Sequence, residues 1–534
     1  MRQKQSGVAE KHYTGYNFND HIWMQSIPKQ NDLLELAERC VRVDGVYYIK
    51  QAQLGHWATF ANITDAIREA GNTWMGGVLK SSTVIDMDLI ETFFKGEAMI
   101  NVGKKTYKEY VGSCPNIQHS MVIPFGPQFA IYDNKKYLNL WKDDMIAPAP
   151  QYVRIGKLVL EMIYRSLCNG DEINSDIETE SQLLLEQVLT NNYTNLDFKM
   201  VIHWLAAIYQ QPGINLQTNL WFCGRQQGVG KGTLTDIMGA VLGKSYVGTL
   251  NQTEVEAGWN DHLKGKLLIN SNEFDTDGKM TGKAWNKWIK AHCNDTTVPI
   301  RQRNTTAHDV LNITNYLFTS NDENPIYLDK SDRRNHLIKT TDDPYWKEFA
   351  GIIKTQYVDR DIEKIAAGFA WILEQVPLDL KFANTSFTNT LKANIIANSQ
   401  NVVEEWITMD GLLLKNKSMS ATDAYNAYKE WSHTSRPGEK QVTEKVFGQL
   451  LKNAGSYGVK WKRTNTGVQY TFGTAIAAAN VDRARVARDV SSIVGETVEV
   501  LNNDVEIVMP TAPVLSQLER MREKLRRMEM EDEF

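Results

Sequence analysis

A glycine-rich stretch near the middle of the chain has the residue types that bind a triphosphate. The segment "WFCGRQQGVGKGTL" (221–234) begins as an apolar strand, passes through glycines and a lysine, and ends where a helix starts. In such loops backbone N–H groups surround the phosphates, a lysine neutralises the β and γ oxygens, and a hydroxyl holds Mg²⁺. We therefore predict binding of ATP and Mg²⁺, with Lys231 on the phosphates and Thr233 on the metal. The predicted nucleotide-binding residues are Gly228, Val229, Gly230, Lys231, Gly232 and Thr233.

The loop departs at two positions from the usual spacing G-x-x-x-x-G-K-[ST]. Arg225 stands at the first glycine position, and Gly232 stands where a serine or threonine is usual, so the hydroxyl of Thr233 comes one residue late. A shifted hydroxyl is compatible with metal binding. The alternative is a glycine-rich helix entry with a solvated lysine, and the apolar strand before the loop favours the phosphate site.

Two further polar groups follow apolar segments that predict neighbouring strands. Glu273 follows "KLLINSN", and we predict that it is the general base that polarises the attacking water. Asn272 takes the place of the usual aspartate, so either Asn272 or Asp275 helps to hold the water shell of the metal. Asn321 ends the segment "NITNYLFTSN", and its amide is predicted to contact the γ-phosphate or the attacking water.

Paired arginines precede one more predicted strand, in "LDKSDRRNHLI". An arginine supplied by a neighbouring subunit stabilises the charge that develops on a γ-phosphate. We predict this role for Arg333 and Arg334. Taken alone, the pair would be interpreted as an ordinary surface pair that binds carboxylates.

The elements around these residues predict an α/β protein. Apolar strand segments alternate with helices from 216 to 345, which is typical of a mostly parallel sheet. The predicted organisation is an accessory α+β domain (1–150), a helical lead-in or oligomerisation segment (151–215), the ATPase core (216–345), a helical connector (346–397), a winged-helix-like domain (398–473) and a charged tail (474–534).

The order and spacing of Lys231, Glu273, Asn321 and the two arginines resemble the superfamily 3 helicases. The resemblance is to the helicase part of phage and plasmid primase-helicases of the poxvirus type, and it covers about residues 120–475. It implies a modified AAA+ fold, a hexameric ring, translocation on single-stranded DNA and a role in replicating viral or plasmid DNA. In the family, the segment between Glu273 and Asn321 forms a hairpin in the channel of the ring.

Basic residues in that segment and in the winged-helix-like domain are predicted to contact DNA phosphates. In the second case, two alternating strands flank an Asn-Thr-Gly turn, and a module for protein contact fits the pattern equally well. Trp285 and Trp288 lie three residues apart and are predicted to pack a helix into the core. The predicted DNA-binding residues are Lys287, Lys290, Arg301, Arg303, Lys460, Lys462 and Arg463.

The composition excludes few functions. The net charge of −5 does not bear on DNA binding, because the local potential decides it. No apolar run is long enough to span a membrane, and five scattered cysteines favour a reducing cytoplasm and no zinc site. We therefore expect a cytoplasmic protein, in a bacterial host if it is phage-encoded. The expected partners are single-stranded and fork DNA, other copies of the chain, and a separate primase or polymerase.

A second enzymatic signal is weaker. Asp86 and Asp88 in "VIDMDLI" imitate the metal-binding pair of a primase, but an alternating strand with exposed aspartates is the favoured interpretation. The predicted function is a replicative DNA helicase. The alternatives are a fused primase-helicase and a DNA-binding initiator or scaffold whose ATP site regulates assembly without unwinding.

Overall fold

A computed structural model gives the fold of the chain. It describes residues 7–8, 14–15, 39–43, 45–51, 57–75, 94, 97–102, 105–110, 116–171, 176–274, 282–301, 307–322, 325–329, 331–399, 402–410, 414, 416–435, 441–465 and 467–473. Four subjects of the sequence analysis lie outside these residues: the pair Asp86 and Asp88, Asp275, Arg303 and the charged tail.

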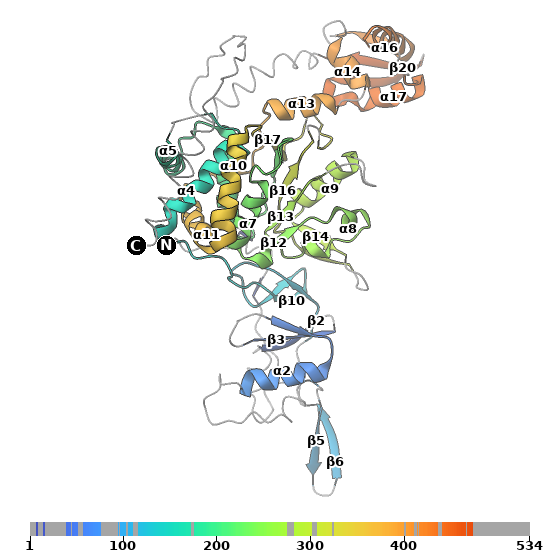
Figure 1. Ribbon diagram of the computed structural model, residues 1–534. Coiled ribbons are helices and arrows are strands. Elements are labelled where there is room, and N and C mark those ends of the chain that lie inside the picture. The colour runs from blue at the N-terminus through green and yellow to red at the C-terminus, as the bar shows by residue number, and fades with distance from the viewer. Residues whose placement is uncertain are drawn as a thin grey trace.

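The centre of the chain forms a five-stranded parallel sheet (Figure 1). Its order is β12-β13-β16-β11-β17. The strands are β11 (Asn219–Cys223), β12 (Val247–Thr249), β13 (Leu268–Ser271), β16 (Asn315–Ser320) and β17 (Asn335–Lys339). All but β12 are buried along nearly their whole length, as expected when helices cover both faces of a parallel sheet. The predicted α/β core with a mostly parallel sheet is confirmed.

Alternate side chains of β11 enter two different cores, because successive residues of a strand point to opposite faces. Leu220 and Phe222 belong to one core and Trp221 and Cys223 to the other. The first core is covered by α4 (Val153–Glu161), η5 (Met162–Leu167), α5 (Ile177–Thr190), α6 (Leu196–Gln210), α7 (Lys231–Leu242), α10 (Pro344–Ile352), η8 (Ile353–Val358), α11 (Asp359–Gln375) and α12 (Leu380–Ala383). The second is covered by α8 (Gln252–Glu256), α9 (Gly282–Asn294) and α13 (Thr390–Asn398).

The N-terminal part of the chain contributes small sheets at one end of the molecule (Figure 1). They are ordered β1-β9-β10-β8, β4-β3-β2-β7 and β5-β6, with α2 (Ile63–Met75) beside β3. Their bounds are β1 (Thr14–Gly15), β2 (Cys40–Val43), β3 (Val46–Lys50), β4 (Trp57–Phe60), β5 (Glu97–Val102), β6 (Lys105–Tyr110), β7 (Asn116–Ile117), β8 (His119–Met121), β9 (Phe129–Tyr132) and β10 (Lys135–Asn139). The limits of an accessory domain in this part stay a prediction.

One N-terminal sheet touches the segment for which a hairpin was expected. Strands β14 (Thr297–Ile300) and β15 (His308–Leu311) pair antiparallel, and the tip between them lies outside the described residues. The ring of His119 in β8 stacks on His308 in β15 with centroids 4.5 Å apart. Because His308 pairs with Ile300 at the end of the arms next to the tip, the N-terminal part supports the arms at that end.

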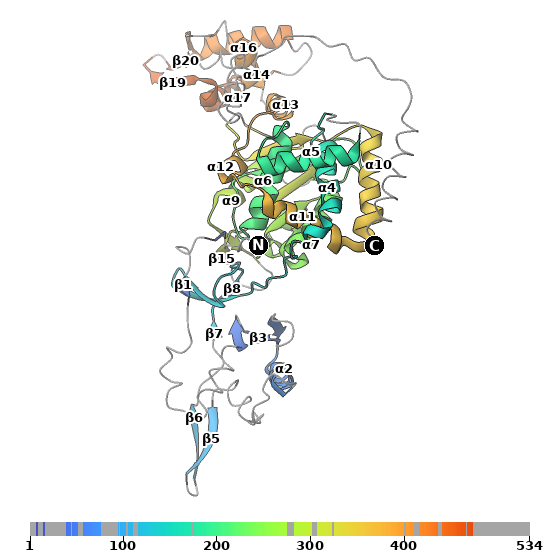
Figure 2. The ribbon, with the colours of Figure 1, turned by 90° about the vertical axis from the view of Figure 1, so that its left-hand side faces the viewer.

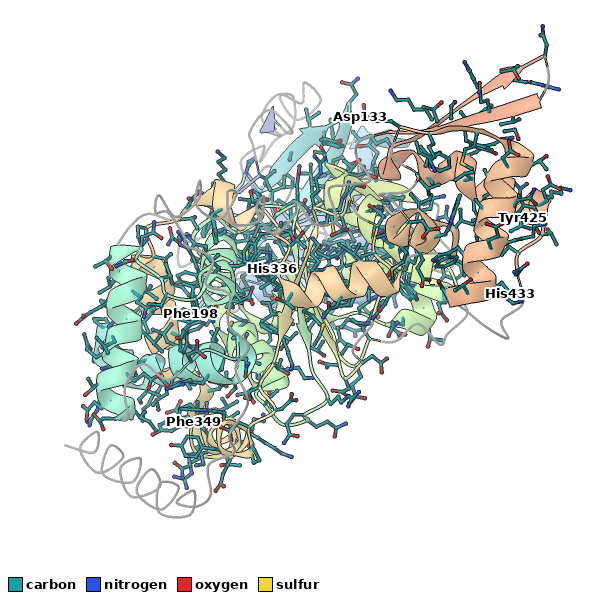
Figure 3. The ribbon with its side chains drawn as sticks, turned by 90° about the horizontal axis from the view of Figure 1, so that it is seen from above. Asp133, Phe198, His336, Phe349, Tyr425 and His433 are labelled. Carbon is teal, nitrogen blue, oxygen red and sulfur yellow. The ribbon has the colours of Figure 1, made fainter. Side chains whose placement is uncertain are left out.

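A separate core lies near the C-terminal end of the described chain. It is built from α14 (Val402–Met409), β18 (Ser418–Ser420), α16 (Ala421–Ser435), α17 (Glu444–Asn453), β19 (Val459–Thr464) and β20 (Gly467–Phe472). The three strands form an antiparallel sheet ordered β18-β20-β19. We call residues 402–473 the C-terminal module; α13 lies between it and the central sheet (Figures 1 and 2). Figure 3 shows Tyr425 and His433 of this module far from Phe349 of α10. The winged-helix assignment stays a prediction.

Among the helices that the described residues form, none is both long and apolar enough to cross a membrane.

Candidate nucleotide site

The glycine-rich loop joins β11 to α7 at the carboxyl edge of the sheet. Gly228 and Gly230 have φ values of 80° and 93°, in the left-handed region that favours glycine. An added Cβ at Gly230 would lie 2.7 Å from Sδ of Met162, so the loop also packs too closely there for a side chain. Gly230 is the N-cap of α7, which begins at Lys231. The N–H groups of the first turn are thus directed to the side where the loop lies, as an anion site requires.

Lys231 reaches the ends of two adjacent strands. Its Nζ lies 3.0 Å from Oδ1 of Asn321, 3.3 Å from the carbonyl oxygen of Ser320 and 3.4 Å from that of Gly224. Burial lowers the pKa of Lys231, while the nearby carboxylate of Glu273 acts in the opposite direction. An ammonium group held only by neutral oxygens in a partly buried place favours an anion beside it.

Glu273 lies at the same edge, just beyond β13. Its φ of 50° is unusual for a non-glycine residue, and its N–H donates to Oγ1 of Thr319 at 3.2 Å. The side chain is exposed. Residues held in this strained region cluster at functional sites. The structure therefore brings Lys231, Asn321 and Glu273 together, as the predicted roles require.

Thr233, the predicted ligand of the metal, is less accessible than Lys231, the predicted ligand of the phosphates. Thr233 is only 8% exposed, whereas an added Cβ at Gly232 would meet nothing within 4 Å. The first turn of α7 is therefore open at Gly232. This is the position where a serine or threonine is usual, and Gly232 has no hydroxyl to offer. Binding of Mg²⁺ by Thr233 stays a prediction, and exposed Asn272 and Glu273 provide other oxygen atoms at this edge.

A lysine that sequence reasoning missed lies over the loop. An added Cβ at Gly228 would come within 3.3 Å of Cε of Lys347, which is an exposed residue of α10. No spacing rule links residues 228 and 347, so only the fold reveals this second cation. A cavity of about 790 Å³ also opens beside the loop, lined in part by Gly224, Arg225 and Asp322.

Arg333 and Arg334 lie at the opposite edge of the sheet. They precede β17, whose first residue pairs with the first residue of β11. Five strand residues rise about 16 Å, so the two arginines are separated from the phosphate loop of their own chain by roughly this distance. Arg333 is exposed. The arrangement gives these arginines no role in the chain's own site but leaves Arg333 accessible to another subunit.

The predicted DNA-binding residues have different surroundings. Lys287 and Arg301 are exposed, whereas Nζ of Lys290 forms an ion pair with Asp329 at 2.5 Å. Lys290 is thus already partnered and is a weaker candidate for a phosphate contact. Trp285 is fully buried and lies against Trp288, in agreement with the packing role.

The C-terminal module presents a cationic edge that was only partly predicted. Residues 444–473 contain five basic side chains and one acidic side chain, Glu444. Trp461 is 49% exposed, with Nζ of Lys452 5.0 Å above its ring. The spacing of Lys445 and Lys452 on the exposed side of α17 was the signal that sequence reasoning overlooked. The cationic edge consists of Lys445, Lys452, Lys460, Lys462 and Arg463, all exposed.

Comparisons with known proteins agree with this architecture. Residues 222–334 match the model of a family described as a family of unknown function (DUF5906). The chain is 24% identical over 227 residues to the DNA primase-polymerase of Nitratiruptor phage NrS-1; the alignment covers 42% of the chain and 30% of that relative. An apo structure of the NrS-1 C-terminal region, with 16% identity and a TM-score of 0.52, covers 81% of this chain and 95% of its own. The A form apo structure of that region gives a TM-score of 0.49 with the same identity and coverage. The first of these structures shows that the fold is shared.

Proposed function

We propose that this chain is an ATP-dependent DNA helicase of superfamily 3 that acts in phage DNA replication as a hexameric ring with an AAA+-type core. The observation that carries the proposal is the meeting of Lys231, Asn321 and Glu273 at the carboxyl edge of one parallel sheet. Similarity to part of a phage DNA primase-polymerase supports a place in replication in a bacterial host.

The loop fits the triphosphate of ATP. The left-handed glycines bring backbone N–H groups close to the phosphates, and Lys231 exchanges its neutral oxygen partners for phosphate oxygens. Lys347 adds a second positive charge above Gly228. Mg²⁺ supplies neutralisation of the charge that develops on the phosphates. Asn272, Glu273 and Thr233 are the residues of this chain that would hold the ion or its water molecules.

The other predicted site residues each have one role in hydrolysis. Glu273 orients the attacking water and takes its proton, and the amide of Asn321 holds the γ-phosphate or that water. Arg333 and Arg334, at the far edge, complete the site of the next subunit. Each nucleotide therefore lies between two copies of the chain, which couples hydrolysis to movement of one subunit against another.

DNA contacts fall on two surfaces in this proposal. Lys287, Arg301 and Arg303, with Lys290 as a secondary contributor, track the single strand in the channel, while the cationic edge of the C-terminal module meets the duplex at the fork. A separate primase or polymerase would act on the unwound strands. A fused primase-helicase stays the alternative, and the pair Asp86 and Asp88 on which it depends lies outside the described residues.

Stimulation of the ATPase by single-stranded DNA tests the proposal against the initiator or scaffold alternative. A helicase is expected to hydrolyse ATP about tenfold faster with single-stranded DNA and to separate a forked duplex. The measurements are steady-state ATPase with and without DNA, and strand separation of a labelled fork. ATP binding without DNA-stimulated turnover or unwinding would support the initiator or scaffold instead.

Removal of charges from the cationic edge tests the duplex contact. Each phosphate contact contributes about 0.9 to the slope of log K against log salt concentration. Replacement of Lys460, Lys462 and Arg463 by Ala is therefore expected to weaken duplex binding and lower this slope by about 0.9 for each lost contact. The measurement is fluorescence anisotropy of a labelled duplex at several salt concentrations.

The matched control for this experiment is a single pair of lysine variants. Lys462→Ala removes a charge from β19, and Lys417→Ala removes an exposed charge beside β18, at the other edge of the same sheet. Only the first should change the salt slope. Equal slopes for both variants and the unmodified protein would favour a module for protein contact.

A further inference from the structure

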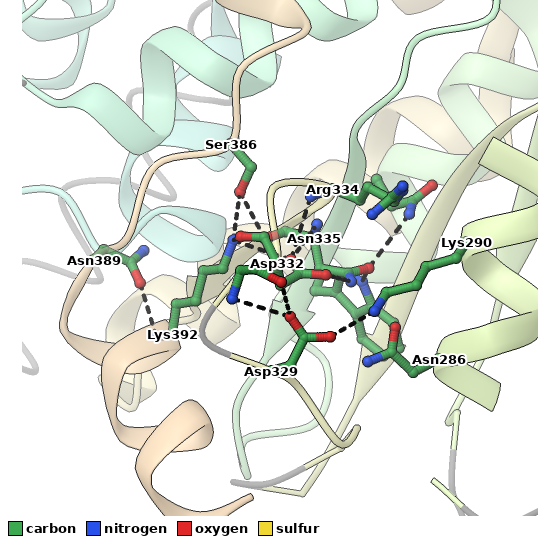
Figure 4. Close-up of polar contacts among 12 residues, drawn as sticks. Asn286, Lys290, Asp329, Asp332, Arg334, Asn335, Ser386, Asn389 and Lys392 are labelled. Atoms are coloured by element: carbon green, nitrogen blue, oxygen red, sulfur yellow. Dashed lines mark hydrogen bonds and ion pairs between the residues drawn. The ribbon is translucent and has the colours of Figure 1, made fainter. Parts of the chain in front are cut away.

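Lys392 in α13 is a lysine with no exposed side-chain surface. Lysines are almost never fully buried unless they are paired. Its Nζ donates to the carbonyl oxygen of Asp332 at 3.0 Å and to Oγ of Ser386 at 2.9 Å, and lies 3.1 Å from Oδ1 of Asp332 (Figure 4). These contacts occupy the three N–H donors of an ammonium group. Lys392 therefore binds Asp332 and Ser386 and has no donor left for an outside ligand.

Asp332 in turn folds the backbone that carries the two arginines. Its Oδ1 accepts hydrogen bonds from the N–H groups of Arg334 at 3.3 Å and Asn335 at 3.0 Å, and its Oδ2 accepts from Nδ2 of Asn335 at 2.9 Å. Asn335 also accepts a hydrogen bond from the buried indole of Trp221 in β11 at 2.9 Å. The turn is thus fixed to the central sheet, and Arg333 projects outward from it.

The other end of the same loop has a weaker brace. Nζ of Lys290 pairs with Asp329, which also accepts hydrogen bonds from the N–H and hydroxyl groups of Ser331. Burial raises the pKa of Asp329, but the hydrogen bonds from Lys290 and Ser331 outweigh it and hold this pKa below its usual value. Both partners of this pair are about one third exposed, so solvent screens it, unlike the fully buried pair.

Loss of the ammonium group would leave a buried carboxylate without an opposite charge. Removal of one partner from a buried pair is strongly destabilising for the local structure, because the remaining charge must find water or a proton. At this position the structure that would loosen is the turn of residues 332–335. The nucleotide loop of the same chain lies at the other edge of the sheet and shares none of the polar contacts of Lys392, although other residues of α13, among them Leu391 and Asn394, line the cavity beside that loop.

We propose that Lys392 is a positioning residue, which acts through Asp332 to hold Arg333 and Arg334 in the geometry that the neighbouring subunit's nucleotide site needs. This inference rests on the proposed function, in which these arginines act between subunits. It gives α13, the last described helix before the C-terminal module, a direct mechanical link to ATP hydrolysis in the next subunit.

Subunit mixing tests the inference. Lys392→Met is expected to bind ATP normally but to hydrolyse it about 100-fold more slowly, the loss that a displacement of about 1 Å can cause. Mixed with Glu273→Gln subunits, whose arginines are intact, it should recover activity at about a quarter of the interfaces, since each interface combines one subunit's site with its neighbour's arginines. Lys354→Met, which loses a lysine paired with Asp236 and Asp359, is the control and should remain active.

A second variant separates positioning from folding. Lys392→Met/Asp332→Asn removes both charges of this pair, and the amide oxygen still accepts from the N–H groups of Arg334 and Asn335, while the side-chain amide of Asn335 loses its acceptor. Its ATPase should exceed that of Lys392→Met about tenfold if positioning is the role. A double variant no better than the single variant would overturn the inference.

The double variant Arg333→Ala/Arg334→Ala is mixed with Glu273→Gln in the same way. It shows whether a failure concerns the role of Lys392 or the action of the arginines between subunits. Recovery by Arg333→Ala/Arg334→Ala but not by Lys392→Met, with subunit exchange confirmed, would overturn the role of Lys392 alone. Recovery by neither would overturn the action of the arginines between subunits, and the inference with it.

Discussion

The Lys231→Ala variant is expected to lose ATP binding, whereas Glu273→Gln is expected to bind ATP and fail to hydrolyse it. Lys231 is the charge that the phosphates would contact, and loss of a charged hydrogen-bonding partner weakens binding by on the order of 100-fold. Glu273 acts only on the water, so its loss leaves binding intact and slows hydrolysis by about 10²- to 10⁴-fold. The two variants therefore separate binding from chemistry.

Equilibrium binding of a fluorescent ATP analogue and steady-state ATPase are the two measurements. Lys244→Ala and Glu256→Gln are matched controls, because they remove the same charges from the core outside the site, and both should behave as the unmodified protein. Equal residual ATPase in the two test variants, or loss of ATP binding by Glu273→Gln, would contradict the assignment of this site.

Much of the site was predictable because its polar residues lie on the segments that follow the carboxyl ends of buried strands. The apolar segments that end before Gly224, Asn272 and Asn321 form β11, β13 and β16. The carboxyl ends of parallel strands meet at one edge of a sheet, where ligands bind. Once the segments are recognised as parallel strands, the sequence alone therefore brings Lys231, Glu273 and Asn321 together.

Other residues could not be predicted because their partners are distant in the sequence. Lys290 lies in a basic segment, yet its partner Asp329 is 39 residues away. Lys392 is 60 residues from Asp332, and nothing in the sequence near it distinguishes a buried lysine from a solvated one. The burial of Thr233 depends on which side of α7 faces the sheet. Because the hydroxyl comes one residue later than is usual in such loops, it lies on a different side of the helix. Sequence spacing reveals local periodicity, whereas these contacts depend on how separate elements pack.

The position of the paired arginines leads to the second large effect. Arg333 and Arg334 precede β17, at the edge of the sheet opposite the phosphate loop and about 16 Å from it along the strand. No movement of the exposed side chain of Arg333 short of unfolding β17 would bring it to Lys231 of the same chain. If these arginines stabilise the charge on a γ-phosphate, the nucleotide must belong to a neighbour.

The Arg333→Ala/Arg334→Ala variant is therefore expected to bind ATP normally and to lose about 10³- to 10⁵-fold in turnover. Mixed with Glu273→Gln protein it should regain activity, because about a quarter of the interfaces then combine an intact Glu273 with intact arginines from the next subunit. The measurement compares the ATPase of the mixture with that of each variant alone, after exchange of labelled subunits has been confirmed. Arginines that act within their own chain predict no gain on mixing, since every site would still lack one of its two groups. A mixture as inactive as its parents would thus remove the structural argument for a ring, and a mixture that gains activity would require that each site be shared between two subunits.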